Sequence, residues 1–176
     1  FRDGFHLFSS DPDTIHFEGT LINPLEWNIT VEANKWNSIA FLGQGALDIT
    51  SAFPSEMVDS IDIVQTSTGQ MWSPAYGINS IGNMLPGVGY QIALNSYTDY
   101  VFSYQTGGAI SQSKSQTIEP EHFNFVKTGL PYSIIIENPK IEGEQLQIGD
   151  EIAVFDGNLC VGAVVYDGSE RISLTA

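Results

Sequence analysis

Positive charge is what this sequence has least of. Its 176 residues include 6 lysines and arginines against 21 aspartates and glutamates, which gives a net charge of −15. Affinity for nucleic acid comes largely from lysine and arginine displacing counterions, and an acidic surface also repels anionic lipid headgroups. Nucleic acid is therefore excluded as the expected partner. The few cations are scattered and form no basic stripe: Arg2, Lys35, Lys114, Lys127, Lys140 and Arg171.

Cysteine and long apolar runs are also scarce. Because Cys160 is the only cysteine, no disulfide can form within the chain. No apolar run approaches the ~18 residues that a spanning helix needs, so we expect no membrane insertion. The start at Phe1 shows no signal-peptide pattern, which predicts a processed chain or a piece of a longer one. Scarce lysine, strong acidity and many small polar residues favour a secreted bacterial protein.

Alternation of apolar and polar residues is present nearly everywhere. Residues 15–18, 27–32, 88–94 and 100–104 alternate with a period of two, which predicts strands. The run at 32–35 is expected to reverse the chain into a further strand within 36–42. The one expected helix is a turn or two from Asp48, whose carboxylate can cap free amides, to Pro54, which stops it.

A composition break divides the chain. Residues 106–120 are small and polar, which is typical of a linker or a long surface loop. Strand-like runs follow at 123–126, 132–137, 150–156, 159–167 and 171–175, and Asp156-Gly157-Asn158 and Asp167-Gly168 read as hairpin turns. We therefore expect an all-β chain of two small antiparallel β-sandwich-like domains, at 1–108 and 120–176, joined by a polar linker at 109–119.

Two long motifs carry a resemblance. The stretch WNSIAFLGQGALDITSAF, followed by IDIVQTSTGQMWSPAYGINSIGNMLPGVGYQIAL, resembles a Trp-Asn module that recurs in large secreted surface proteins of bacteroidete-type bacteria. The stretch YSIIIENPKIEGEQLQIGDEIAVFDGNLCVGAVV resembles an element with a GDEIxVFDGxLCVGA core that is often found beside it. The resemblance covers about two-thirds of the chain. It implies an extracellular, cell-surface, multi-domain parent of adhesive or structural function, and it implies no catalytic residues.

Catalytic constellations are missing from the sequence. His6, His16 and His122 stand in separate strand-like runs without metal-ligand spacing, and solvent-facing strand positions are the better interpretation. Cys160 has no cationic neighbour in sequence, which favours structural burial over a reactive thiolate. We therefore expect no enzyme. A small β-sandwich hydrolase with a pair of facing carboxylates is the weakest of the functions considered.

Three minor sites are expected from short patterns. Calcium needs only several oxygen ligands, so Asp11, Asp13 and the loop at Asp156 are candidate ligands for it, and we expect no other cofactor. Asp13-Thr14-Ile15 and Asp59-Ser60-Ile61 match a three-residue acceptor pattern for O-glycans. Thr14 and Ser60 are therefore candidate glycosylation sites.

Exposed aromatics supply the alternative function. Trp72 and Tyr76 could form a platform for a sugar ring, which would make the chain a carbohydrate-binding module with polysaccharide as its partner. The competing interpretation is that Trp72, with Met71 and Ile78, closes one end of a β-sandwich. The first hypothesis remains an extracellular structural or adhesive module, a subunit of an assembly whose partners are other copies or neighbouring domains of the parent.

The predicted core and the end of the chain complete these expectations. Residues 120–176 stop within an alternating run, so we expect an incomplete domain that a continuation or a strand from another chain completes. The residues predicted to be buried are apolar and lie in the expected strands: Ile29, Phe41, Ile63, Tyr90, Ile92, Ile134, Ile136, Val154, Cys160 and Val164.

Overall fold

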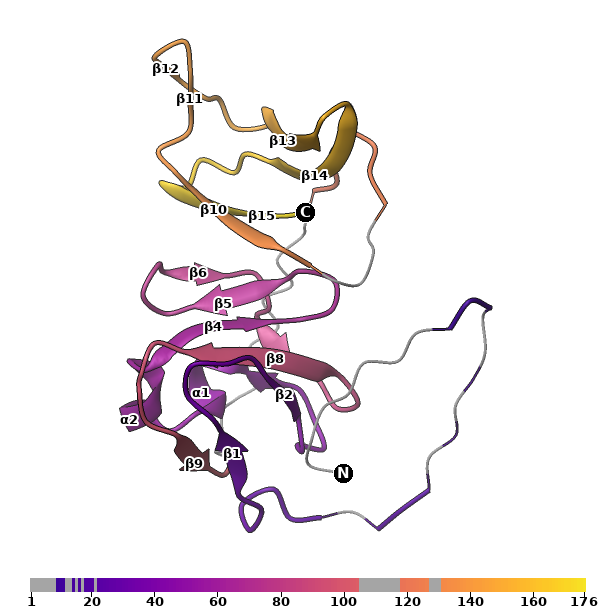
Figure 1. Ribbon diagram of the computed structural model, residues 1–176, viewed down its shortest axis with the longest axis vertical. Helices are drawn as coiled ribbons and strands as arrows, with labels where there is room; N and C mark the ends of the chain where they lie inside the picture. Colours follow the sequence, from indigo (N-terminus) through magenta and orange to yellow (C-terminus); the bar gives the residue numbers. More distant parts are fainter. Residues whose placement is uncertain are drawn as a thin grey trace.

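The computed structural model describes residues 9–11, 14, 16, 18–20, 22–104, 118–126 and 131–176. Within these residues the chain forms antiparallel strands and two helices of four residues each, which confirms the all-β prediction. Neither helix has the length and apolar character that a membrane crossing requires. We call residues 22–104 the first unit, and residues 118–126 with 131–176 the second unit (Figure 1). Their division into two domains joined by a linker at 109–119 stays a prediction, and 105–117 lie outside the described residues.

A five-stranded antiparallel sheet forms the centre of the first unit. Its strands follow the order β2-β8-β4-β5-β6, so β8, which the alternation at 88–94 predicted, pairs on both sides. Two further pairs flank the sheet, β1 with β9 and β3 with β7. The strands of this unit are β1 (Ile29–Val31), β2 (Asn37–Ala40), β3 (Leu47–Asp48), β4 (Ile61–Gln65), β5 (Met71–Ser73), β6 (Ile78–Asn79), β7 (Asn83–Met84), β8 (Gly89–Leu94) and β9 (Tyr100–Phe102).

The two helices lie between β3 and β4. Helix α1 (Ile49–Ala52) follows Asp48, whose carboxylate accepts hydrogen bonds from the amide of Thr50 at 2.8 Å and from its hydroxyl at 2.6 Å. Phe53 is extended, and α2 (Ser55–Val58) begins directly after Pro54, so the proline ends one helix and precedes the next. The predicted helical turns from Asp48 to Pro54 are confirmed, but the expectation of a single helix is wrong, because α2 follows the proline.

Aromatic rings fill the core of the first unit. Phe53 stacks on Trp72 with ring centroids 5.7 Å apart, and it also contacts Phe102 at 5.2 Å and Tyr104 at 6.1 Å. The hydroxyl of the fully buried Tyr104 donates to the carbonyl of Ala40 at 3.0 Å. Burial raises the pKa of this phenol, because the anion would lose its hydration. The Tyr104 hydroxyl, which belongs to the largest fully buried side chain of the core, therefore has a hydrogen-bond partner.

Burial in the first unit follows the predicted pattern except in β4. Ile29, Phe41, Tyr90 and Ile92 are buried as predicted. Ile63, however, is only half-buried, while the next residue, Val64, is completely buried. The ladder between β4 and β8 shifts register between Ile61 and Ile63. Such an irregularity breaks the alternation of faces, which is why the parity prediction was wrong at this position.

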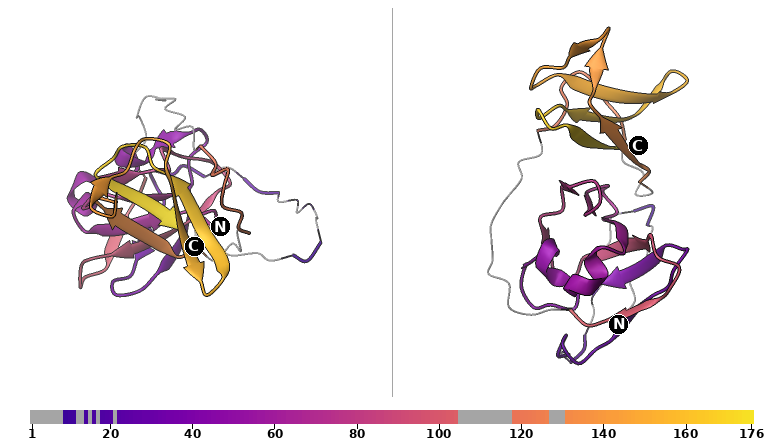
Figure 2. Two further views of the ribbon diagram at one scale, coloured as in Figure 1. Left: turned by 90° about the horizontal axis from the view of Figure 1, so that it is seen from above. Right: turned by 90° about the vertical axis from the view of Figure 1, so that its left-hand side faces the viewer.

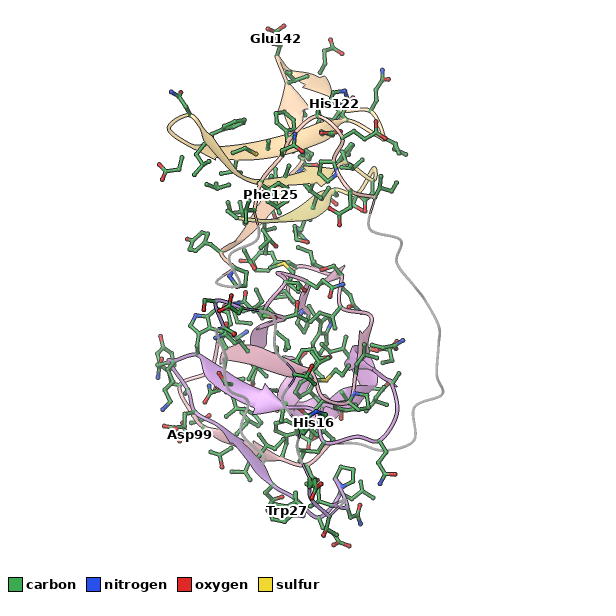
Figure 3. The ribbon with its side chains drawn as sticks, turned by 90° about the vertical axis from the view of Figure 1, so that its right-hand side faces the viewer. His16, Trp27, Asp99, His122, Phe125 and Glu142 are labelled. Atoms are coloured by element: carbon green, nitrogen blue, oxygen red, sulfur yellow. The ribbon has the colours of Figure 1, made fainter. Side chains whose placement is uncertain are left out.

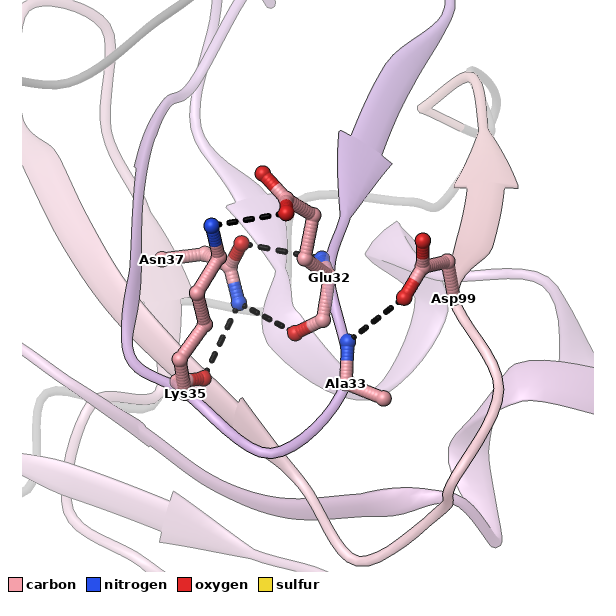
Figure 4. Close-up of polar contacts among 5 residues, drawn as sticks. All are labelled: Glu32, Ala33, Lys35, Asn37 and Asp99. Carbon is pink, nitrogen blue, oxygen red and sulfur yellow. Dashed lines mark hydrogen bonds and ion pairs between the residues drawn. The ribbon is translucent and has the colours of Figure 1, made fainter.

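The turn that reverses the chain after β1 is held by side chains (Figure 4). The amide group of Asn37 accepts from the Glu32 backbone amide at 2.9 Å and donates to the carbonyls of Glu32 at 2.8 Å and Lys35 at 3.1 Å. Asp99 accepts from the amide of Ala33 at 2.9 Å. Lys35 and Glu32 add an ion pair of 2.7 Å. The predicted reversal at 32–35 is confirmed, although β1 and β2 then pair with different strands.

The second unit consists of two longer strand pairs and a short one. β10 pairs with β15, β11 with β12, and β13 with β14. Figures 1 and 2 show this unit at one end of the molecule, and in Figure 1 β10 and β15 lie nearer the first unit than β13 and β14. The strands are β10 (Ser133–Glu137), β11 (Lys140–Ile141), β12 (Glu144–Gln145), β13 (Glu151–Asp156), β14 (Leu159–Val165) and β15 (Arg171–Thr175).

Turn chemistry was interpreted correctly at one site and wrongly at another. Asp156 pairs with Leu159 across the β13–β14 turn, and Gly157 there has a φ of 59°, as a tight hairpin requires. Gly168 also has a positive φ, but the strands on either side of Asp167-Gly168 do not pair with each other. β14 pairs with β13 and β15 with β10, so the second predicted hairpin is wrong.

The strand predicted at 123–126 is also wrong. These residues have no regular secondary structure. The segment is held through the backbone amide of Glu121, which donates to the carboxylate of Glu151, and not by a neighbouring strand. The predicted strand at 15–18 falls largely outside the described residues.

The strand pairs of the second unit approach each other closely at Gly162. A Cβ atom at this position would lie 2.8 Å from the carbonyl carbon of Thr175 and 3.0 Å from the Cα of Ala176. Only glycine lets β14 and the end of β15 come this close. The end of β15 is fixed in turn by two backbone hydrogen bonds between Tyr132 and Ala176, of 2.8 and 2.9 Å.

Candidate functional site

The two aromatic residues proposed as a sugar platform have different environments. Trp72 leaves 5% of its surface exposed and stacks on Phe53, so its ring belongs to the core. Met71 and Ile78 are buried as well, as the competing interpretation predicts. Tyr76 lies in the turn between β5 and β6 and is 41% exposed. A platform at this place would therefore have Tyr76 alone as its open ring.

Arg171 connects Tyr76 with the second unit. Its Nε donates to a Glu137 carboxylate oxygen at 2.7 Å, and the charged hydrogen bond raises the pKa of the guanidinium. The guanidinium carbon also lies 6.0 Å from the centre of the Tyr76 ring, and Nη1 reaches the Tyr76 carbonyl at 3.5 Å. The first and last strands of the second unit, β10 and β15, thus meet the turn of the first unit at this arginine.

Two further hydrogen bonds join the units. Thr175 donates its hydroxyl to the carbonyl of Gly69 at 2.8 Å, in the turn between β4 and β5. Ser133 donates to the side-chain oxygen of Gln65 at 3.1 Å, and the amide nitrogen of that glutamine is bonded to Gln91. These contacts are polar, as contacts between units within one chain commonly are.

A groove runs between the units. It has a volume of about 1610 Å³, which exceeds the roughly 300–1,000 Å³ of small-molecule pockets. One side is formed by the turns around Gly69 and Tyr76, and the other by β14 and β15. Residues 118–120 and 124–126 also line it.

The strands beside this groove are apolar on both faces. Ile152, Val154 and Val164 share one face of the β13–β14 pair, while Ala153 and Ala163 share the other. All of them are half-buried. Strands that are apolar on both faces are normally covered on both. The residues predicted to be buried in this unit are likewise only half-buried, so the prediction is wrong for them: Ile134, Ile136, Val154, Cys160 and Val164.

The segment 118–126 is anchored by Glu151. The carboxylate of this residue accepts from the amides of Glu121 at 2.7 Å and His122 at 3.0 Å, and from His122 Nδ1 at 2.9 Å. Phe123 packs edge-on against Phe155 with centroids 5.9 Å apart. Sequence reasoning missed this anchor, because the partners are about thirty residues apart and only the acid at the start of β13 signals it.

The anchor shifts the pKa of both partners. The hydrogen bond and charge of Glu151 raise the pKa of His122. Desolvation alone would raise the pKa of the Glu151 carboxyl, but the hydrogen bonds from His122 and the two amides outweigh it and lower this pKa. The imidazole itself is 80% exposed, so it faces solvent as predicted from the sequence.

The other histidines and the cysteine form no cluster with this pair. His16 is exposed and lies in a different part of the molecule from His122 (Figure 3), while His6 falls outside the described residues. Cys160 is half-buried in β14, and its Sγ lies 3.7 Å from the carbonyl of Gly162. Within the described part of the chain, no three His, Cys, Asp or Glu side chains are grouped as a metal site would require.

The residues proposed for calcium and glycans are placed as follows. Asp11 and Asp156 are exposed, and Asp13 lies outside the described residues. Thr14 is exposed, whereas Ser60 is half-buried and donates its hydroxyl to that of Tyr100 at 3.2 Å. Calcium binding and glycosylation at these positions stay predictions.

Comparisons with family models, with curated proteins and with solved structures found no match. The motif resemblance therefore remains a prediction.

Proposed function

We propose that this chain is an extracellular structural or adhesive module of a bacterial surface protein and that its second unit joins it to an assembly. The observation that carries the proposal is the β13–β14 pair, which is apolar on both faces and half-buried throughout its centre. The two motifs that resemble modules of secreted surface proteins support the extracellular setting.

Exposed apolar side chains at the β13–β14 hairpin favour an assembly. In the first unit the apolar residues of β4, β5 and β8 are largely buried. In the second unit Phe155 is 51% exposed and Leu159 is 67% exposed, at the tip of the β13–β14 hairpin. The first unit also exposes large apolar side chains, among them Trp36, Tyr97 and Val101, but a group of such residues at one hairpin tip is a candidate interaction surface.

Labelling of intact cells tests the proposal. Antibodies raised against the chain should label unpermeabilised cells of the source organism, and the labelled protein should sediment in a fraction of high mass. An antibody against a cytoplasmic protein, applied to the same cells, serves as the control. Labelling only after permeabilisation would refute the extracellular setting, and a protein of monomeric size in every fraction would refute the assembly.

The carbohydrate-binding alternative rests on Tyr76, the half-exposed aromatic beside the groove. A pull-down with insoluble polysaccharides tests it: Tyr76→Ala should abolish binding, while Tyr97→Ala, at a tyrosine that is 90% exposed elsewhere, should not. Equal retention of the two variants would count against a site at Tyr76.

A further inference from the structure

We propose that the groove along β14 receives an extended peptide strand with an apolar centre and basic flanks, donated by another polypeptide. This inference rests on the proposed function, since it names the partner through which the second unit would join an assembly. Within the described residues, β14 pairs only with β13, and most residues of β14 line the groove.

The direction of the backbone groups follows from the hydrogen bonds next to β14. Tyr166 donates its amide to the carbonyl of Asp150 at 2.7 Å, so its backbone points toward β13. In an antiparallel ladder, every second residue bonds across to the same neighbour. Val165 and Ala163 therefore turn their amides and carbonyls away from β13. In the part of the chain that the structure describes, no second strand pairs with these groups.

The edge of β14 lacks the charged residues and the proline that often block pairing, although its ladder with β13 is irregular between Val154 and Phe155. Exposed strand edges are usually protected by lysine, proline or an inward-pointing charge. β14 reads LCVGAVV, with no charged residue and no proline along its seven residues. An unprotected edge of this kind accepts an added strand, as in many complexes with extended peptides.

The side chains around the groove define the chemistry of the occupant. Leu159 is 67% exposed and Ile118 is 67% exposed, and both line the groove, so apolar side chains of a peptide would find partners there. Asp167 and Glu170 are acids of the lining, whereas Arg171 of the lining is paired with Glu137. A peptide whose charge complements this lining is therefore positively charged.

A second copy of the chain is a poor occupant by the same reasoning. Each copy carries a net charge of −15, so two copies repel each other at low salt. A strand from a different polypeptide that carries positive charge is instead attracted by the negative charge of this chain. We therefore assign the groove to a peptide with lysine or arginine on both sides of an apolar, alternating centre.

The test is an NMR titration of the 15N-labelled full chain with synthetic peptides. The probe alternates valine and threonine and has a lysine pair at each end. One control peptide replaces the lysines by glutamates, and another carries N-methyl groups on every second amide. The probe should shift the amide signals of Ala163 and Val165. The glutamate peptide should bind at least about tenfold more weakly, and the methylated peptide should not bind.

Two variants locate the site. Ala163→Pro removes an outward amide and should abolish binding, because proline cannot donate to an added strand. Leu159→Lys alters an exposed side chain that the fold tolerates, and it should weaken binding of the lysine peptide by about tenfold or more. Val101→Lys, at a residue 60% exposed on β9, is the matched control and should leave the affinity unchanged.

Several outcomes would overturn the inference. The groove is not the site if no peptide shifts Ala163 and Val165, or if Leu159→Lys binds as tightly as the original chain. Equal affinity of the lysine and glutamate peptides would refute the basic partner, and concentration-dependent shifts of these amides without peptide would identify a second copy as the occupant. Failure of these titrations leaves the cell-surface labelling unaffected, so the two proposals fail separately.

Discussion

Replacing Gly162 with alanine should destabilise the second unit, because the new methyl carbon would collide with the backbone of β15. It would lie 2.8 Å from the carbonyl carbon of Thr175, whereas ordinary contacts begin at 3.4 Å, so the end of β15 must retreat by at least about 0.6 Å. That end carries the two hydrogen bonds between Tyr132 and Ala176. Overpacking costs about 1–3 kcal/mol and each weakened hydrogen bond about 0.5–1.5 kcal/mol. With both hydrogen bonds weakened, we expect a loss of about 2–6 kcal/mol.

Hydrogen exchange followed by mass spectrometry suits this test, because all three tryptophans lie in the first unit and fluorescence would report on that unit alone. Peptides covering β10 and β15 should lose protection in Gly162→Ala, while those covering β4 and β8 should keep it. Gly45→Ala is the matched control: a Cβ there meets nothing within 4 Å, and its φ is not positive. If protection of β10 and β15 changes by less than about 0.5 kcal/mol, the close packing of β14 on β15 is refuted.

Three further predictions concern local contacts. Asn37→Ala removes three hydrogen bonds of the turn after β1 and should cost about 1–3 kcal/mol in urea unfolding followed by tryptophan fluorescence. Asp48→Ala removes the cap of α1 and should lower the free energy of unfolding by about 1 kcal/mol in the same assay. An unchanged free energy of unfolding would contradict the Asn37 hydrogen bonds in the first variant and the cap in the second. The pair of His122 and Glu151 should stabilise the second unit most between pH 4.5 and 6.5. The raised pKa of His122 makes its contribution fade as the pH rises beyond 6.5, and the lowered pKa of Glu151 makes its contribution fade as the pH falls below 4.5. Hydrogen exchange of residues 118–126 measured across this pH range should show the strongest protection between these two pH values. This pH dependence should disappear in Glu151→Gln.

Features that depend on neighbouring residues were predictable from the sequence. The helical turns after Asp48 follow from one carboxylate and one proline, and the hairpin at Gly157 follows from a turn that needs a positive φ. The bounds of β13 and β15 lie within a residue of the runs expected at 150–156 and 171–175. Each of these signals is local, so the distant parts of the fold do not alter it.

Features that depend on distant partners were not predictable. Asp167-Gly168 has the chemistry of a hairpin turn, but β15 pairs with β10 instead of its sequence neighbour. Residues 123–126 alternate like a strand, yet the carboxylate of Glu151 holds the preceding amides. The contact between Arg171 and Tyr76 joins residues 95 positions apart, and neither residue shows it in the local pattern. The groove and the free edge of β14 arise from these distant pairings.

Whether the second edge of β14 is open to another strand can be measured directly by amide hydrogen exchange along β14, resolved residue by residue by NMR on the free chain. We predict an alternation: the amides of Val164 and Tyr166, which point toward β13, exchange slowly, and those of Ala163 and Val165, which point away from β13, exchange fast. Equal, strong protection of all four amides would show that the edge is already paired. The second unit would then offer no open strand to another polypeptide.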